Sequence, residues 1–330
     1  MINKMSFANF KSWKKFDSIN FSKLTAFFGT NSSGKTSILN FLLLLKQSEE
    51  STDRKQVLEF GNSNHYTELG SFTDMIYQHD TNQTFSFDID FSLPQSLKVY
   101  DPQASKKSHI LFEIENLKFY SKVVQQTNTK RIFVEEMGYK FENYDFHLYR
   151  SREDRYDYTL SARDGNFSFT RSPGRAWPLP EPEKFYGFPD QTRTYYQNAG
   201  FLFDFQLKLE EFLSRIYYLG PLREYPKRQY TWTGATPSDM GKKGEKFIDA
   251  LLASRQTGEK ISRGRSYPRF TVEEYVAYWL KKLGLIYSFS IDEIAANSNI
   301  YQVHVKKTEN SSPVLITDVG FGVSQVLPKY

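Results

Sequence analysis

The chain of 330 residues contains no cysteine and no long apolar run. Without cysteine it can form neither disulfides nor thiolate metal sites, and it cannot use a cysteine nucleophile. The longest strongly apolar run is Phe41 to Leu45, far short of the roughly 20 residues of a membrane-spanning helix. The N-terminus also lacks the apolar core, roughly 7–15 residues long, of a secretory signal. These absences predict a cytoplasmic protein without a membrane segment.

Histidine is also scarce, and the five histidines show no metal-ligand spacing such as H-E-x-x-H, which argues against a zinc site. Aromatic residues, in contrast, make up 17% of the chain, and many fall in alternating stretches typical of strands. The basic residues are unevenly spread. Residues 222–270 carry 11 Lys and Arg against 5 Asp and Glu, whereas the remainder carries 32 against 33. This basic segment either faces the phosphates of DNA or of a nucleotide, or forms a solvated surface.

The first 97 residues combine short strands with one helix. Strand-like runs precede a glycine-rich segment, the last of them at residues 24–29, and another strand is predicted at 57–60. A helix is predicted from about Gly34 to Gln47, because apolar residues recur after the glycines. A strand, a glycine-rich turn and a helix in this order are typical of an α/β core.

The rest of the chain divides in two by its pattern. Residues 98–198 contain aromatic-rich alternating runs, which predict an inserted antiparallel β-rich lobe. Residues 199–330 contain helical patterns near 244–254 and 271–285, followed by strand-like runs. The expected organisation is therefore an N-terminal lobe over residues 1–97, the inserted lobe, and a C-terminal part that carries the basic segment.

The segment GTNSSGKT, from Gly29 to Thr36, satisfies the pattern G-x-x-x-x-G-K-[ST] between a predicted strand and a predicted helix. The glycines let the backbone turn tightly, so that N–H groups and the helix dipole surround a phosphate. Lys35 should reach the β- and γ-phosphates of ATP, and the Thr36 hydroxyl should bind Mg²⁺. The predicted nucleotide contacts are Gly29, Asn31, Ser32, Ser33, Gly34, Lys35, Thr36 and Ser37.

Together with Asn9-Phe10-Lys11-Ser12 ahead of it, this segment resembles the opening of ATPases of the SMC, RecF and OLD-nuclease type. Three further segments fit the same group: ELGSFTDMIYQHD, YLGPLREYPKRQYTWTGATPSDMGKKGE and ITDVGFGVSQVLP. The resemblance implies an α/β P-loop NTPase core of the ABC/SMC type, with the β-rich lobe inserted into it. It also places Lys11 and Ser12 beside the nucleotide.

Near the C-terminus, the segment DVGFGVSQ resembles the signature that caps the γ-phosphate bound by the opposite subunit in ABC-type and SMC-type dimers. By that resemblance the chain forms a homodimer or higher oligomer. Glycines and a serine at a helix N-terminus suit this role, because bare N–H groups attract phosphate. The residues expected to contact nucleotide across the dimer are Gly320, Gly322, Ser324 and Gln325.

The same family continues beyond the signature into an apolar strand that ends in acidic residues, the Walker B motif, which hold Mg²⁺ and polarise the attacking water. The sequence reaches Tyr330 before such a strand, so we expect a partner polypeptide or a part removed from this chain to supply the acidic pair. Asp292 and Glu293 follow an apolar run but precede the signature, and Gln47 and Gln78 are weak matches to the family's Q-loop. No catalytic residue is therefore assigned.

The resemblance implies an ATP·Mg²⁺-binding head that hydrolyses ATP and controls a DNA-acting or nuclease effector, often in defence against phage. Whether this chain alone is an enzyme stays open, because a module that senses ATP without turnover fits the same residues. A third hypothesis is a P-loop kinase that phosphorylates a small substrate. The basic segment 222–270 is the candidate contact for DNA, and Arg223 is a candidate contact for nucleotide or a neighbouring subunit.

Overall fold

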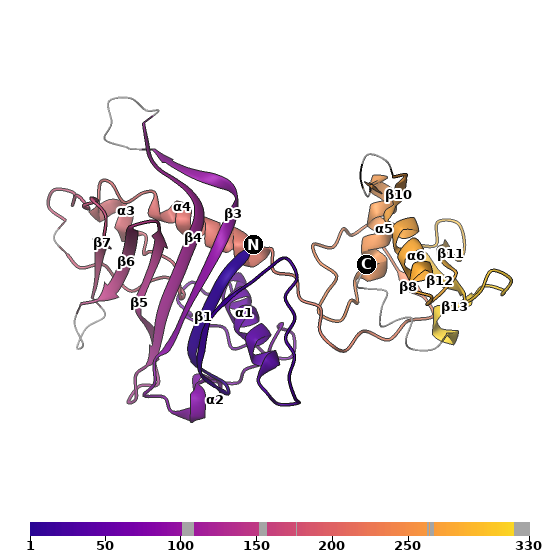
Figure 1. The fold of residues 1–330 in the computed structure, drawn as a ribbon, viewed down its shortest axis with the longest axis horizontal. Coiled ribbons are helices and arrows are strands. Elements are labelled where there is room, and N and C mark those ends of the chain that lie inside the picture. Colours follow the sequence, from indigo (N-terminus) through magenta and orange to yellow (C-terminus); the bar gives the residue numbers. More distant parts are fainter. Residues whose placement is uncertain (101–108, 152–156, 176, 263, 265–266, 320–330) are drawn as a thin grey trace. The chain divides into compact units, whose positions relative to one another are not determined.

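The chain forms two compact units in the computed structural model, the first over Met1–Ile216 and the second over Tyr217–Tyr330 (Figure 1). Each unit has its own hydrophobic core. The residues that the structure describes are 1–100, 109–151, 157–175, 177–262, 264 and 267–319. No helix in this described part of the chain has the length and apolar character needed to cross a bilayer.

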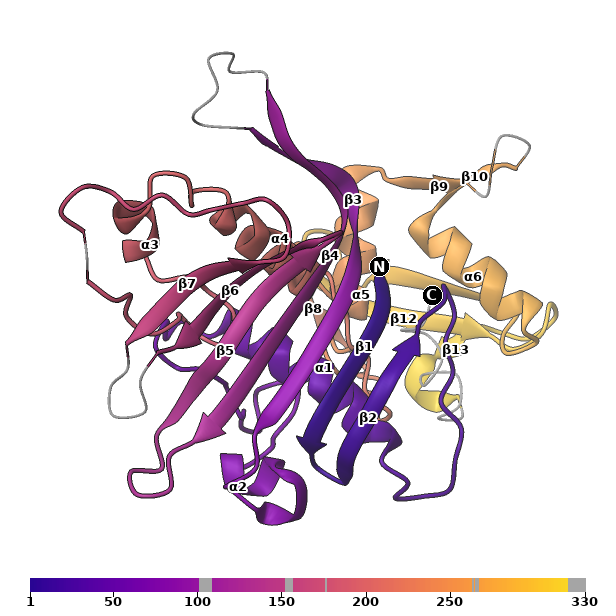
Figure 2. The ribbon, with the colours of Figure 1, turned by 60° about the vertical axis from the view of Figure 1, so that its left-hand side comes forward.

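One sheet of seven strands frames the first unit (Figure 2). Its order is β2-β1-β3-β4-β5-β6-β7, and all neighbouring strands are antiparallel. β3 runs through residues 97 and 98, so strands from both predicted lobes lie in this one sheet. The antiparallel arrangement expected after residue 98 is confirmed. The strands are β1 (Ile2–Phe10), β2 (Trp13–Asn20), β3 (Phe85–Tyr100), β4 (Ile110–Gln125), β5 (Ile132–Phe141), β6 (Tyr144–Arg150) and β7 (Tyr158–Arg163).

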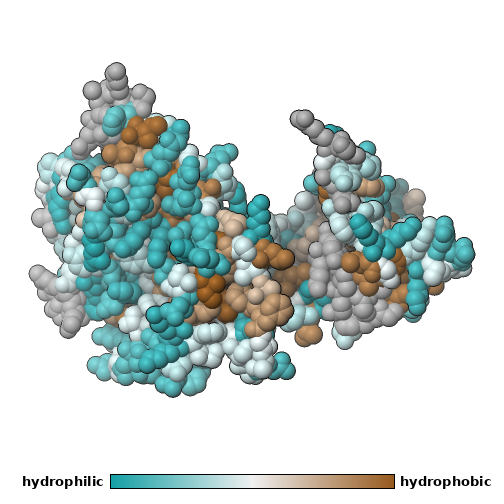
Figure 3. Space-filling view, in the orientation of Figure 1, coloured by the Kyte–Doolittle hydropathy of each residue, from teal (hydrophilic) through white to brown (hydrophobic). Residues whose placement is uncertain are grey.

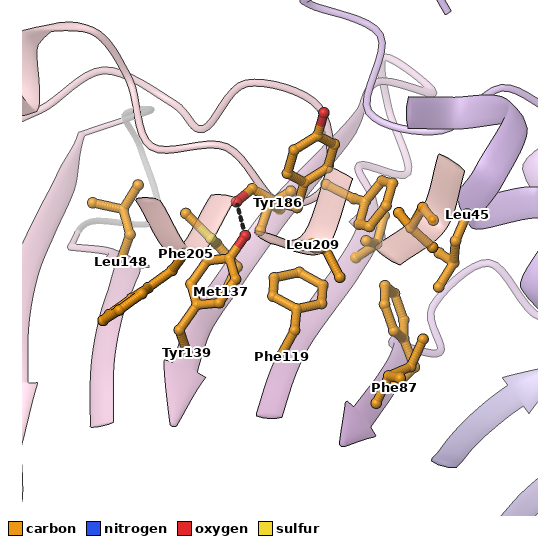
Figure 4. Packing of buried hydrophobic residues seen from close by; sticks show 14 of the residues in the cluster. Leu45, Phe87, Phe119, Met137, Tyr139, Leu148, Tyr186, Phe205 and Leu209 are labelled. Atoms are coloured by element: carbon orange, nitrogen blue, oxygen red, sulfur yellow. Dashed lines mark hydrogen bonds between the residues drawn. The ribbon is translucent and has the colours of Figure 1, made fainter. Parts of the chain in front are cut away.

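Two helices, α1 (Lys35–Glu50) and α4 (Leu202–Ser214), cover one face of this sheet. The core lies between the helices and the sheet. The ring of Phe41 in α1 lies 5.3 Å from the ring of Phe87 in β3, measured between centroids, and Figure 4 shows Phe205 of α4 among the rings of the same layer. Each such buried ring stabilises the fold by about 1.5–3 kcal/mol. The shorter helices of this unit are α2 (Phe72–Met75), η1 (Tyr77–His79) and α3 (Gln191–Tyr195).

The opposite face of the sheet is polar, because side chains alternate between the two faces along each strand. Ion pairs connect neighbouring strands on this face: Lys118 lies 2.8 Å from Asp88, and Lys122 lies 2.8 Å from Glu136. These four residues border a hollow of about 610 Å³. Figure 3 shows that this face is mainly hydrophilic.

Two strands predicted from the sequence are wrong. Residues 24–29 and 57–60 form no strand, and no described strand pairs with either segment. A strand needs a neighbour for its backbone N–H and C=O groups, and periodicity alone does not reveal whether one is present. The predicted helix over 34–47 is confirmed, and it continues to Glu50.

The second unit packs two helices against a small antiparallel sheet of order β11-β12-β13, in which β8 also pairs with β12. β9 and β10 form a separate hairpin. The helices predicted near 244–254 and 271–285 are confirmed, as are the first two strand-like runs after them. Of the last such run, residues 314–318, only Val314–Leu315 form a strand, and Ile316–Asp318 form η2. The predicted signature residues Gly320, Gly322, Ser324 and Gln325 lie outside the described residues. The elements are β8 (Tyr230–Thr231), α5 (Phe247–Thr257), β9 (Lys260–Ser262), β10 (Arg269–Thr271), α6 (Val272–Lys282), β11 (Ser288–Glu293), β12 (Ile300–Lys306), β13 (Val314–Leu315) and η2 (Ile316–Asp318).

Candidate functional site

The glycine-rich loop ends where α1 begins. The N-cap of α1 is Gly34, whose φ of 85° lies in the left-handed region, and no side chain caps the helix. The backbone N–H groups of Lys35 and Thr36 therefore have no partner among the described residues and are available to a ligand, whereas that of Ser37 donates to the carbonyl oxygen of Gly34 at 3.0 Å. Asn31, Ser32 and Ser33 of the loop are exposed. An uncapped helix start beside an exposed loop favours an anion, because the N–H groups and the positive end of the dipole point to the same place.

The ammonium group of Lys35 lies across this loop. Its Nζ donates hydrogen bonds to the carbonyl oxygens of Gly29 at 2.8 Å and of Thr30 at 2.6 Å, and a longer one to Ser33 Oγ at 3.4 Å. These contacts hold a positive charge within the turn at the start of α1. A phosphate at this place would meet the ammonium and the helix N–H groups together.

The loop has no room for a side chain at Gly29 or at Gly34. A methyl group at Gly34 would lie 2.6 Å from Trp13 Nε1 and 2.8 Å from Ser12 Oγ. A methyl group at Gly29 would lie 2.8 Å from Ser33 Oγ. The loop thus keeps its tight course because neither position carries a side chain, and this is the backbone arrangement that a phosphate-binding turn requires.

Thr36 and Ser37 lie in the first turn of α1, Thr36 exposed and Ser37 half-buried. The Thr36 hydroxyl makes no hydrogen bond to any residue that the structure describes. A hydroxyl oxygen beside a bound polyphosphate is a suitable ligand for Mg²⁺. Within the described ranges, no group of three or more His, Asp or Glu side chains could hold a metal ion by itself. A metal at this loop would therefore depend on Thr36 and on the phosphates.

The turn between β1 and β2 lies against the glycine-rich loop. Trp13 Nε1 donates a hydrogen bond to the carbonyl oxygen of Gly34 at 3.1 Å, and Ser12 lies beside the same glycine. Lys11 turns toward α2 instead, where its Nζ donates to the carbonyl oxygen of Asp74 at 3.4 Å. Burial lowers the pKa of Lys11, and the carboxylate of Asp74 partly opposes this. The structure thus brings Ser12 to the loop and adds Trp13, which the sequence reading missed although it directly follows the Asn-Phe-Lys-Ser segment.

Gln47, one of the two Q-loop candidates, has a structural role. Its Nε2 donates to the carbonyl oxygen of Glu59 at 2.6 Å, and its Oε1 accepts from the backbone N–H of Thr67 at 3.1 Å. The side chain is only 2% exposed, so both ends of the amide are used to tie the loop after α1 to the helix. The other candidate, Gln78, lies in η1 with a φ of 55°.

The acidic candidates of the second unit are engaged within that unit. Asp292 at the end of β11 lies 3.0 Å from Nδ1 of His304, and Glu293 accepts a hydrogen bond from the backbone N–H of Asn299 at 3.1 Å. Arg223, the candidate for nucleotide or subunit contact, has its Nε and Nη1 atoms buried without a hydrogen-bond partner among the described residues. These contacts give the two carboxylates structural partners, whereas Nε and Nη1 of Arg223 have none among the described residues.

A family model described as AAA ATPase domain matches residues 1–171, which is slightly more than half of the chain. The match includes the glycine-rich loop at residues 29–36, α1 and all seven strands of the first sheet. No curated protein shows a significant match to the chain.

Proposed function

The chain belongs to the family of AAA ATPase domains, and from this we propose that it binds ATP with Mg²⁺ at residues 29–36. The observation that carries the proposal is the position of the Lys35 ammonium, held by the carbonyl oxygens of Gly29 and Thr30 at the start of α1. Lys35 and the helix N–H groups bind the β- and γ-phosphates, and the Thr36 hydroxyl is the protein's ligand to Mg²⁺. The bound Mg²⁺ supplies charge that stabilises phosphate transfer.

Within this family we assign the chain to the ATPases of the SMC, RecF and OLD type. The contact of the Trp13 indole with Gly34 supports this, because it joins the Asn-Phe-Lys-Ser turn to the phosphate loop. Such a head works as a homodimer or higher oligomer, in which the signature of one copy closes over the nucleotide of the other. Gly320, Gly322, Ser324 and Gln325 are the residues proposed for that contact.

ATP hydrolysis also needs carboxylates that polarise water. We assign these to a strand that docks before the glycine-rich loop and that belongs either to a partner polypeptide or to a part removed from this chain. Leu24 and Phe28 are 89% and 92% exposed, and Ala26 between them is exposed as well. Phe27 points to the other side, where its ring lies 6.2 Å from that of Phe21. An apolar stripe with a period of two, on a segment without a strand neighbour, is suited to receive an added strand.

The output that we propose is control of a DNA-acting or nuclease effector, in defence against phage and in the cytoplasm. The excess of basic residues over 222–270 supports a DNA contact, because phosphodiester backbones bind surfaces of this charge.

Nucleotide binding and phosphate release together test the proposal. The wild-type chain should bind a fluorescent ATP analogue with Mg²⁺, the Lys35→Ala variant should not, and the matched Lys23→Ala variant, at an exposed residue, should bind normally. Unchanged binding by Lys35→Ala would overturn the proposed site. Phosphate release should be slow for the chain alone and should rise when the effector partner is added.

A module that senses ATP without turnover is the second candidate function. It is favoured by the contacts of Asp292 and Glu293, whose carboxylates are already engaged in the second unit. Nucleotide binding with no phosphate release, with or without a partner, would establish it. An ATP-dependent dimer on a sizing column would support either ATP-binding function against a kinase of small substrates.

A further inference from the structure

Four aromatic rings form a cluster on the second unit outside its hydrophobic core. Phe270 in β10 stacks on Tyr278 in α6, with centroids 5.9 Å apart and an interplanar angle of 27°. Trp279 meets Tyr278 edge-on at 5.6 Å and Tyr275 at 6.3 Å. All four rings are half-buried, and within the described residues none of them packs against the core of this unit. We call this set, Phe270, Tyr275, Tyr278 and Trp279, the aromatic cluster.

The sequence of α6 explains why these rings share one side of the helix. Val276 and Leu280 are fully buried and face the core. Positions 275, 278, 279 and 282 are spaced by three and four residues, so they form a second stripe along the helix. A capping box at Thr271 starts α6 directly after β10 and thereby holds Phe270 next to this stripe.

One cationic side chain lies over the aromatic cluster. The Lys282 ammonium lies 5.4 Å from the ring centroid of Trp279 and 5.8 Å from that of Tyr278. The exposed residues Lys260 and Arg269 lie on the adjoining hairpin of β9 and β10, on the face opposite Phe270. The aromatic cluster therefore combines aromatic rings with the positive charge of Lys282.

We propose that this surface binds single-stranded nucleic acid. Aromatic side chains stack on unpaired bases, and lysine and arginine beside them bind the phosphodiester backbone. A duplex fits poorly, because its bases are already stacked on one another and hide their faces. The inference rests on the proposed DNA contact of segment 222–270. It narrows the proposed substrate to single strands and extends the proposed binding surface to α6. It is independent of the nucleotide site in the first unit.

Fluorescence anisotropy with the full-length chain tests this inference. The probes are labelled oligomers of dT and of rU, which separate DNA from RNA, and a duplex of the same length. The wild-type chain should prefer the single strands to the duplex. Trp279→Leu and Tyr278→Leu should each weaken single-strand binding about ten-fold, whereas Trp279→Phe, which keeps a ring, should retain most of it. Lys282→Gln should reduce the salt dependence by about one phosphate contact.

The matched control is Tyr217→Leu, at a residue of the same unit that is 71% exposed and outside the aromatic cluster; its binding should not change. Thermal melting identifies any variant that fails to fold. For folded variants, the comparison of Trp279→Leu with Trp279→Phe then shows whether single-strand binding needs an aromatic ring at position 279. Equal binding of duplex and single strands, unaffected by the ring variants, would overturn this inference and leave the DNA contact intact. No binding to any of the three probes would overturn both, while binding of ATP to the first unit would stand.

Discussion

The indole nitrogen of Trp13 donates a hydrogen bond to the carbonyl oxygen of Gly34 at 3.1 Å. Twenty residues of chain separate the two, and Trp13 begins β2 whereas Gly34 is the N-cap of α1. The contact therefore fixes the start of the helix against the edge of the sheet. Since the phosphate loop ends at this cap, its shape depends on the first β-hairpin as well as on its own glycines.

Trp13→Phe should weaken ATP binding while the fold is kept. Phenylalanine retains the edge-on contact of the ring with Phe16, at 5.3 Å between centroids, but cannot donate to Gly34. The loss of one such hydrogen bond should lower the free energy of unfolding by about 1 kcal/mol. Titration with a fluorescent ATP analogue and denaturant unfolding measure the two effects. Trp177→Phe, at a residue that is 56% exposed, is the control, and an equal loss of affinity in both variants would contradict the coupling.

Gly34→Ala should abolish ATP binding. A second glycine, Gly174, separates the cost of the backbone conformation from the cost of the steric clash. Gly34 has a φ of 85°, and an added methyl group would lie 2.6 Å from Trp13 Nε1. Gly174 has a similar φ of 74° but nothing within 4 Å of the added methyl group. Gly174→Ala should therefore show only the backbone cost of about 1–2 kcal/mol. Gly34→Ala should destabilise by about 1–3 kcal/mol more, because overpacking adds to that cost. Similar unfolding free energies for the two variants would show that Trp13 moves to accommodate the added methyl group, and would contradict the predicted extra cost.

The sequence predicts the loop and helix of the site well because both are local. The glycines, Lys35 and the apolar residues of α1 lie within one short segment, and the helix forms within three residues of its expected end. The strand predicted at residues 24–29 is wrong for the opposite reason. Residues 24–29 are a short, mostly apolar run like that of a strand, but strand formation needs a neighbour far away in the sequence.

Contacts between different elements explain which functional residues could not be predicted from the sequence. Trp13 has no pattern that marks it as a partner of Gly34, because their contact depends on how β2 packs beside α1. Phe270 lies outside the helix predicted at 271–285, and only the start of that helix at Thr271 brings its ring next to those of Tyr278 and Trp279. A motif lies within one short segment of sequence, whereas these contacts join different elements of the fold.

Gln47→Leu should destabilise the first unit without changing ATP affinity. The variant leaves the carbonyl group of Glu59 and the N–H group of Thr67 without their side-chain partner, and each such group costs about 1–3 kcal/mol when buried. A loss of about 2–4 kcal/mol is therefore expected from denaturant unfolding. Gln256→Leu, at an exposed residue, should have little effect. If the folded Gln47→Leu variant binds ATP far more weakly than the wild type, the residue acts at the nucleotide after all.

Glu136→Gln should remove part of the acid sensitivity of the first unit. Glu136 is 8% exposed on the polar face of the sheet and lies 2.8 Å from both Lys122 and Arg163. Burial alone would raise the pKa of Glu136, but the two cations outweigh it and hold the pKa below its ordinary value. A carboxylate with a lowered pKa stabilises the fold above the pKa of the unfolded chain, and this stabilisation is lost as the pH falls through the pKa of the folded state.

The Glu136→Gln variant should therefore be less stable than the wild type near neutral pH, by about 1.5–3 kcal/mol for hydrogen bonds to charged groups. Its unfolding free energy should fall less than that of the wild type between about pH 5 and about pH 3, because it has no proton to take up at this position. Denaturant titrations across this range, followed by circular dichroism, give both values. Glu135→Gln changes the exposed neighbour and should keep the wild-type slope. Parallel curves for wild type and Glu136→Gln would mean that the two cations do not lower the pKa of Glu136, since only a proton taken up at this carboxylate makes the curves converge in acid.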